Sequence, residues 1–100
     1  MAEYDSILGA PRAAPMDKVM GYPLTNLMGV EDVIIPKGSE FLAMAVNDNQ
    51  ISMWFLITPD SIEQNARFHK YLTLQDILAS AVYRGTAILN GRTLHVFQDL

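Results

Sequence analysis

From Lys18 to the C-terminus, apolar residues occur in short runs separated by turn-forming residues, and this pattern limits the fold more than any other feature. Such spacing is typical of an all-β domain. It predicts strands over residues 18–24, 32–35, 40–46, 51–58, 67–72, 83–89 and 92–97. One flat sheet of these strands would leave an apolar face in water. We therefore expect a mainly β fold, a small antiparallel β-sandwich or partly open barrel of about seven strands.

Three of the segments between these strands have clear turn sequences. Asn90-Gly91 lies between two alternating runs, and this dipeptide is the strongest short-range signal for a hairpin. Residues 47–50 (NDNQ) predict a second hairpin connection, because Asn and Asp tolerate the left-handed backbone conformation. Pro36-Lys37-Gly38 predicts a turn that ends the strand before it.

Two segments stand out within this pattern. Residues 51–58 (ISMWFLIT) carry apolar side chains on both faces of an alternating strand, so we expect a central strand or one covered twice. Residues 74–82 have apolar side chains at helical spacing after Thr73, a good N-cap, and they predict one short helix.

The chain divides into an arm and one domain. Residues 1–17 show neither a strand nor a helix pattern, and Pro11 and Pro15 favour extended backbone, so we interpret this segment as an N-terminal arm. Its apolar residues would allow it to dock on a neighbouring subunit or on the domain, and a mobile tail is the alternative. Residues 18–100 then form a single β-rich domain.

Composition excludes several function classes. The chain has no cysteine, which removes disulfides, zinc ribbons and thiol catalysis. Neither a membrane span nor a signal segment is present in the pattern, and a net charge of −4 argues against binding of duplex nucleic acid. The two histidines are isolated from acids, and no phosphate loop or nucleophile motif occurs, so we expect no metal, no cofactor and no enzymatic activity.

The candidate binding residues come mainly from the C-terminal part. Residues 1–63 carry three basic and nine acidic side chains, whereas residues 64–100 carry four basic and two acidic ones. Arginine forks and lysines bind phosphates, histidines bind anions, and a strand tryptophan stacks on a base or fills a partner's pocket. The candidate ligand-binding residues are Arg84, Arg92, Lys70, His69, His95 and Trp54. For each of them an ordinary structural role, as exposed charge or core filling, is the alternative.

A small open β-domain with this many apolar residues has unpaired strand edges and little core to hide them in. We therefore expect a homo-oligomer, a symmetric dimer at least, with its interface on a strand edge or on the Trp54 face. Any captured ligand is then expected where two subunits meet.

The order of four segments supports a family resemblance. Tyr22-Pro23-Leu24, VIIPKGSEFLAMAV, ISMWFLITP and YRGTAILNGRTLHVF follow one another along the chain. Together they resemble a group of short phage-encoded all-β proteins of unassigned function, whose pattern is K-Y-P-L, I-P-x-G-A, W-A-L-V, Y-x-G-T and F-H-V-F. The resemblance covers about residues 18–98. Residues 58–82 differ from that pattern, the arm has no counterpart in it, and it assigns no catalytic residue.

The resemblance implies a phage accessory protein in the cytoplasm of the infected bacterial host. We expect it to act by stoichiometric binding that counters a host defence. It would either sequester a nucleotide immune signal between subunits or occlude a host defence protein. The alternative is a virion or phage assembly module, for which no concave polar pocket is expected.

Overall fold

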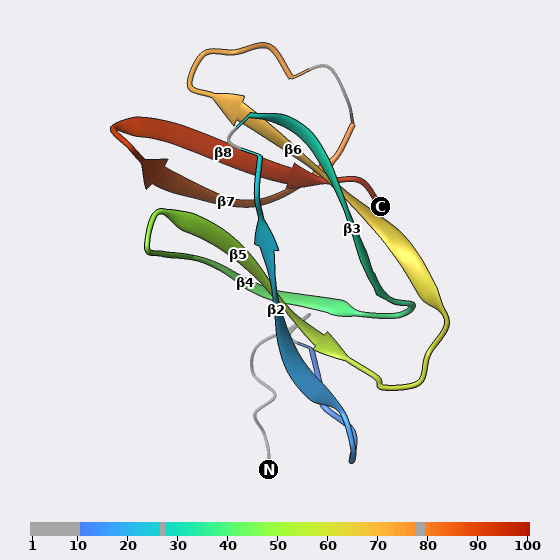
Figure 1. Ribbon diagram of the computed structural model, residues 1–100. Coiled ribbons are helices and arrows are strands. Elements are labelled where there is room, and N and C mark those ends of the chain that lie inside the picture. Colours follow the sequence, from blue (N-terminus) through green and yellow to red (C-terminus); the bar gives the residue numbers. More distant parts are fainter. Residues whose placement is uncertain (1–10, 27, 78–79) are drawn as a thin grey trace.

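The computed structural model describes residues 11–26, 28–77 and 80–100, which form a sandwich of two antiparallel β-sheets (Figure 1). The seven strands are β2 (Lys18–Leu24), β3 (Gly29–Pro36), β4 (Glu40–Asn47), β5 (Gln50–Ile57), β6 (Glu63–Leu72), β7 (Val82–Leu89) and β8 (Arg92–Gln98). One sheet has the order β2-β5-β4 and the other has the order β3-β6-β8-β7. The expectation of an antiparallel β-sandwich is confirmed.

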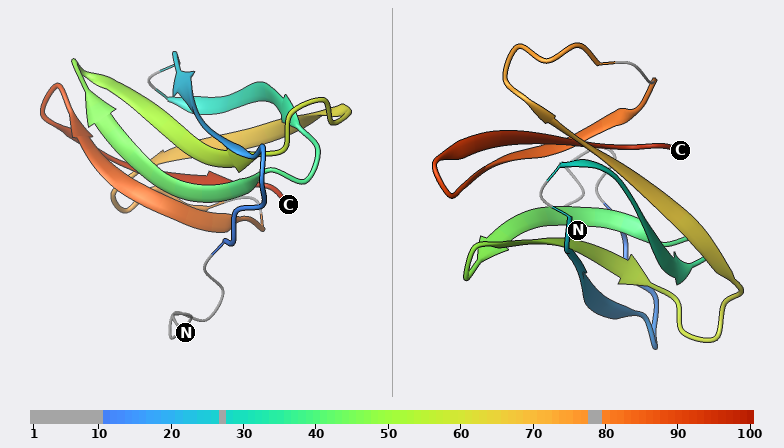
Figure 2. Two further views of the ribbon diagram at one scale, coloured as in Figure 1. Left: turned by 90° about the horizontal axis from the view of Figure 1, so that it is seen from below. Right: turned by 45° about the horizontal axis from the view of Figure 1, so that its top comes forward.

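The chain crosses between the sheets three times, from β2 to β3, from β3 to β4 and from β5 to β6 (Figure 2). The other three connections stay within one sheet: the segment between β6 and β7 and the two predicted hairpins, β4–β5 and β7–β8. Asp48 and Asn49 have φ values of 52° and 59°, and Asn90 and Gly91 have φ values of 50° and 77°. Positive φ at both central residues is the two-residue turn whose twist matches a hairpin. Both hairpin predictions are confirmed.

Alternation along the strands builds one core between the sheets. The central strand β5 points Ile51, Met53 and Phe55 inward, each at most 2% exposed. Phe68 of β6 meets them from the other sheet, with its ring centroid 6.3 Å from that of Phe55 at 61°. Aromatic pairs prefer such an edge-to-face arrangement, which adds to the energy of burial. The prediction that residues 51–58 form a central strand is confirmed.

Every edge strand carries a feature that opposes pairing with another chain. Pro23 in β2 and Pro36 in β3 lack a backbone N–H. The ladders of β4 and β7 each have a register shift of the bulge type, after Phe41 and after Tyr83. Proline and bulges are common means of blocking edge-to-edge association. Contacts with other molecules are therefore favoured on the sheet faces and at the ends of the sandwich.

A buried ion pair closes the core beside the first crossover. Lys70 of β6 points inward with its side chain 0% exposed, and its Nζ lies 2.8 Å from Oε1 of Glu31 on β3. Lys70 Nζ also donates to the backbone carbonyl of Asn26. The Glu31 carboxylate accepts from the backbone N–H groups of Thr25 and Asn26 at 2.8 and 2.9 Å. The pair thus fixes the crossover backbone to the four-stranded sheet.

The described residues of segment 74–82 form no helix, so that prediction is wrong for them; residues 78–79 lie outside the described part. Leu74 has a φ of 69°, and its side chain is 98% exposed. The Gln75 backbone donates to the carbonyl of Leu72, while its side-chain oxygen accepts from the Leu72 N–H at 2.9 Å. A turn held in this way stops a helix before its first turn is complete.

Asp17 joins the described part of the arm to the domain. Residues 11–17 contain a turn, and the rest of the arm lies outside the described residues. The Asp17 carboxylate accepts from the Ala14 backbone at 2.8 Å and from the Thr58 hydroxyl at 3.1 Å. This contact joins the end of the arm to the end of β5.

The Glu31–Lys70 pair predicts acid sensitivity. Burial alone raises the pKa of Glu31, but the hydrogen bonds from Lys70, Thr25 and Asn26 outweigh it and lower the pKa from 4.5 to about 2. This stabilisation is complete above the unfolded-state pKa of 4.5 and is lost as the pH falls towards 2. We expect Glu31→Gln to reduce the free energy of unfolding by about 3 kcal/mol at pH 7 and by much less near pH 2.

Urea titrations of the wild type and of Glu31→Gln across this pH range measure the difference. The exposed Glu40 offers a matched control, Glu40→Gln, with a far smaller effect. A loss of stability in Glu31→Gln that stays constant from pH 7 to pH 2 contradicts the prediction.

Candidate functional site

The outer face of the four-stranded sheet carries three neighbouring aromatic side chains, Tyr71 on β6, Phe97 on β8 and Tyr83 on β7. We call these three the aromatic face. Tyr71 and Phe97 lie outward because their neighbours Lys70 and Val96 point into the core. Tyr83 lies on the same side because the bulge after it reverses the alternation that buries Ala87 of β7.

The rings pack against one another in a fixed arrangement. The Phe97 ring lies 5.9 Å from Tyr71 and 5.4 Å from Tyr83 between centroids, at 73° and 63°. The His69 ring is parallel to Tyr71, with 6.2 Å between centroids and 4° between planes. Tyr71 is only 8% exposed, whereas Tyr83 is 54% exposed. A buried aromatic ring next to a half-exposed one is suited to hold a flat molecule.

A hollow of about 250 Å³ lies over the aromatic face. Its other wall is the turn that follows β6, from which Thr73, Leu74, Gln75 and Ile77 contribute. Leu72 and His95 complete the lining. The volume lies just below the range of about 300–1,000 Å³ that is usual for small-molecule pockets.

A chain of hydrogen bonds crosses this hollow. The His95 ring is held at both nitrogens, by the Thr73 hydroxyl at Nε2 and by the Thr86 hydroxyl at Nδ1, each at 2.9 Å. The Tyr83 hydroxyl lies 2.5 Å from that of Thr86. A neutral imidazole donates from one nitrogen and accepts at the other, so all the bonds run in one direction for a given tautomer. One end of the chain then has a free donor and the other end a free acceptor.

The lining of this hollow contains no lysine, arginine, aspartate or glutamate. Two polar pairs lie elsewhere on this outer face. His69 donates to Asp99 at 2.8 Å, and Arg67 donates to Asp32 at 2.8 Å. The hydrogen bond from Arg67 also lowers the pKa of the Asp32 carboxyl. The lining of the hollow therefore offers ring surfaces and uncharged hydrogen-bonding groups.

Two of the predicted ligand-binding cations have partners within the fold, Lys70 buried and Arg84 half-buried. Lys70 is paired with Glu31, as described above. Arg84 occupies the bulge of β7, where its guanidinium carbon lies 4.5 Å from the centroid of the Phe41 ring and its Nε donates to Gln98 at 2.9 Å. Burial lowers the pKa of Arg84. Both cations therefore have internal partners.

The other predicted residues lie on three separate surfaces. Arg92 is exposed at the β7–β8 turn, at one end of the sandwich. Trp54 is 39% exposed on the outer face of the three-stranded sheet, where its ring covers Gly21 so closely that an added Cβ would lie 2.8 Å from it. His69 and His95 share the outer face of the four-stranded sheet. The six residues therefore form no single site, and a hollow lies beside His95 on the histidine surface.

The aromatic face itself was missed by the sequence reasoning. A partial signal was present, because Tyr71 and Phe97 alternate with core residues on predicted strands; strict alternation would place Tyr83 beside the buried Ala87, and only the bulge turns it outward. Pairing between β6 and β8 was needed to bring them together, since Tyr71 and Phe97 are 26 positions apart in sequence. No short-range pattern specifies which strands pair across such a separation.

The described residues contain no group of three or more histidine, aspartate or glutamate side chains arranged to hold a metal ion. They also contain no helix of the length and hydropathy required to span a membrane.

Comparison with known proteins identifies the family. No curated protein and no solved structure matches this chain. One family model, described as a domain of unknown function (DUF7352), matches residues 16–100, which is the whole sandwich and the end of the arm. The chain therefore belongs to the DUF7352 family.

Proposed function

We propose that this protein binds the planar base of a nucleotide-type ligand in the hollow over the aromatic face and acts by stoichiometric binding, without catalysis. The observation that carries the proposal is the hollow of about 250 Å³ bordered by Tyr71, Phe97 and Tyr83. Stacking of a base on aromatic side chains contributes about 1–3 kcal/mol per base and tolerates different bases. The half-exposed ring of Tyr83 is the accessible stacking partner.

The hydrogen-bond chain through His95 supports a heteroaromatic ligand over a plain hydrocarbon. Its two ends, at Thr73 and Tyr83, offer one donor and one acceptor in either tautomer. The edge of a nucleobase presents donors and acceptors in the same plane. Because His95 can adopt either neutral tautomer, this chain of hydrogen bonds can match either order of donor and acceptor on the ligand.

The neutral lining limits what is recognised. A phosphate bound by an arginine fork was one expectation from the sequence, yet the residues around the hollow offer no such group. We therefore propose that the base, with its sugar, supplies the affinity while any phosphate stays in solvent. The hollow is built from one chain, so the proposed site needs no second subunit to complete it.

The resemblance to phage-encoded proteins gives this proposal its biological setting. A protein that removes a nucleotide immune signal from the cytoplasm of an infected bacterium counters the defence that depends on that signal. The hollow over the aromatic face favours this role over occlusion of a host defence protein, which requires no small-molecule pocket.

We also propose that the chain forms a homodimer through the outer face of the three-stranded sheet. The edges of both sheets are blocked, as described above, which leaves the faces. Trp54 lies flat over Gly21 there, and the exposed Val19 and the small Ala43 extend the surface beside it. A two-fold interface brings a patch against its own copy, and an uncharged patch avoids like-charge repulsion in that position.

Calorimetric titration with adenosine, guanosine, their mononucleotides and a cyclic dinucleotide tests the binding proposal. We expect saturable binding of at least one base class, with a nucleoside about as tight as its mononucleotide and little change with salt, because no charged contact is lost. Tyr83→Ala removes the stacking surface, and we expect it to weaken binding at least about fivefold. Tyr83→Phe keeps the ring, so we expect it to weaken binding less than Tyr83→Ala does.

Trp54→Ala is the control, because it removes an exposed aromatic side chain from the opposite sheet. Loss of binding in this variant together with unchanged binding in Tyr83→Ala would place the ligand on the wrong face for our proposal. The proposal is also contradicted if none of the base classes shows saturable binding.

Sedimentation velocity tests the dimer. We expect a dimer at micromolar concentration for the wild type and a monomer for Val19→Glu, because the substitution places two like charges across the two-fold axis. Ile88→Glu is a matched control on β7, where the isoleucine is 70% exposed on the other sheet. A monomeric wild type, or a Val19→Glu variant that stays dimeric, refutes the proposed interface.

A further inference from the structure

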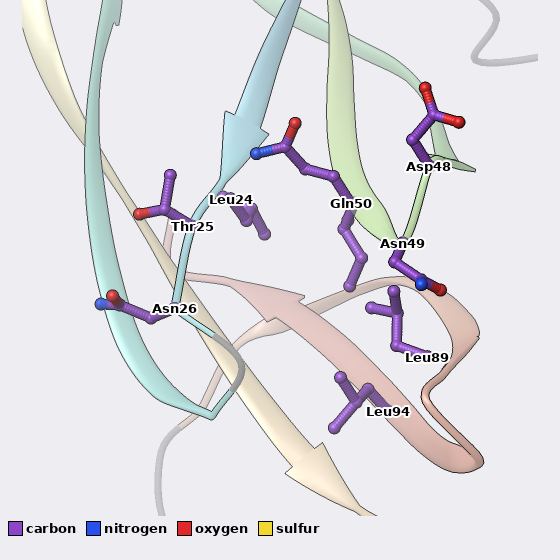
Figure 3. A pocket seen from close by; sticks show the side chains of 9 residues that line it. Leu24, Thr25, Asn26, Asp48, Asn49, Gln50, Leu89 and Leu94 are labelled. Atoms are coloured by element: carbon purple, nitrogen blue, oxygen red, sulfur yellow. The ribbon is translucent and has the colours of Figure 1, made fainter.

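The two hairpin turns lie at the same end of the sandwich and leave an opening between the sheets, which we call the mouth (Figure 3). On one side are Asp48, Asn49 and Gln50 of the β4–β5 hairpin. On the other side are Leu89 and Leu94 of the β7–β8 hairpin. Each hairpin belongs to a different sheet, so no backbone ladder closes the gap between them.

The floor of the mouth is apolar and its rim is polar. A cavity of about 290 Å³ reaches down to Leu24, Ile51, Leu89 and Leu94, each at most 4% exposed. Around the opening stand Thr25, Asn26, Asp48, Asn49 and Gln50. An apolar floor with a few polar groups at the opening is the usual form of a small-molecule site.

A second cavity of about 240 Å³ continues this space toward a positive charge. It shares Leu89 and Leu94 with the first cavity and extends to Met28, Asn90 and Arg92. Arg92 is exposed, and among residues 11–26, 28–77 and 80–100 no ion pair involves it. The other arginines of the C-terminal part, Arg67 and Arg84, are occupied by Asp32 and by Phe41 with Gln98. Arg92 is therefore available to an external anion.

We propose that the mouth binds a small amphipathic anion, a molecule with a short alkyl part and one carboxylate or phosphate group. The alkyl part lies on Leu89 and Leu94, and the anionic group pairs with Arg92. Asp48 stands on the opposite hairpin and repels an anion there, so the charges of the rim fix one orientation. This site is separate from the hollow over the aromatic face and does not depend on the function proposed for it.

Titration of the ¹⁵N-labelled protein with octanoate, followed by NMR, tests the site, with octyl phosphate and 1-octanol as parallel probes. We expect saturable shifts confined to the two hairpins and to residues 24–26. Octanol lacks the charge and should bind more weakly than either anion. Arg92→Gln should weaken octanoate about tenfold and leave octanol unchanged, since it removes one charged hydrogen bond and no apolar contact.

Lys37→Gln is the matched control, because Lys37 is also exposed, forms no ion pair in the described chain and does not line the mouth. It should bind octanoate as the wild type does, and so should Tyr83→Ala, which alters the aromatic hollow. Equal affinity for octanoate and octanol, an equal loss in the lysine variant, or shifts spread over the whole surface overturns the proposal. The relative affinities of octanoate and octyl phosphate show which anion the arginine prefers.

Discussion

The register of β6 depends on one buried interaction, the ion pair between Lys70 and Glu31. A lysine is almost never fully buried unless it is paired, and here the partner comes from the neighbouring strand β3. A shift of β6 by one residue would move Lys70 into solvent and leave the Glu31 carboxylate without its cation. The same shift would turn Tyr71 and His69 into the core. The ion pair therefore also fixes the register in which Tyr71 and His69 point outward.

Most basic residues of the C-terminal part have partners within the protein. The buried Lys70 is held by a carboxylate, and the half-buried Arg84 is held by an aromatic ring and an amide. Arg67 is held on the surface by Asp32. Removing the partner of a buried charge is far more costly than removing an exposed pair. A local excess of basic residues in the sequence therefore says little about where an anion binds until the internal partners are known.

Most of the fold was predictable from local patterns, and the site was not. Each hairpin, at residues 47–50 and at Asn90-Gly91, depends on two residues with positive φ. The residue types at these positions are ones that favour this conformation, so the hairpins are predictable from the sequence. The apolar spacing of residues 74–82 wrongly predicted a helix. Leu74 has a left-handed backbone conformation and the Gln75 side chain bonds the Leu72 N–H, and together they hold a turn instead. The aromatic face and the mouth depend on which strands pair and which hairpins share an end, and these are long-range facts. The burial of Lys70 was invisible for the same reason, since Glu31 is 39 residues away.

The two candidate binding sites lie on opposite sides of the same two strands. On β8, Leu94 faces the mouth while its neighbour His95 faces the aromatic hollow; on β7, Leu89 faces the mouth and Tyr83 the hollow. Coupling between such sites requires an element with two arrangements that each ligand biases differently. The β7–β8 pair is a regular ladder from residue 85 to the turn, with its one bulge at the far end of β7. A ladder of this kind holds a single register, so occupation of one site leaves the other unchanged, and substitutions in each report on that site alone.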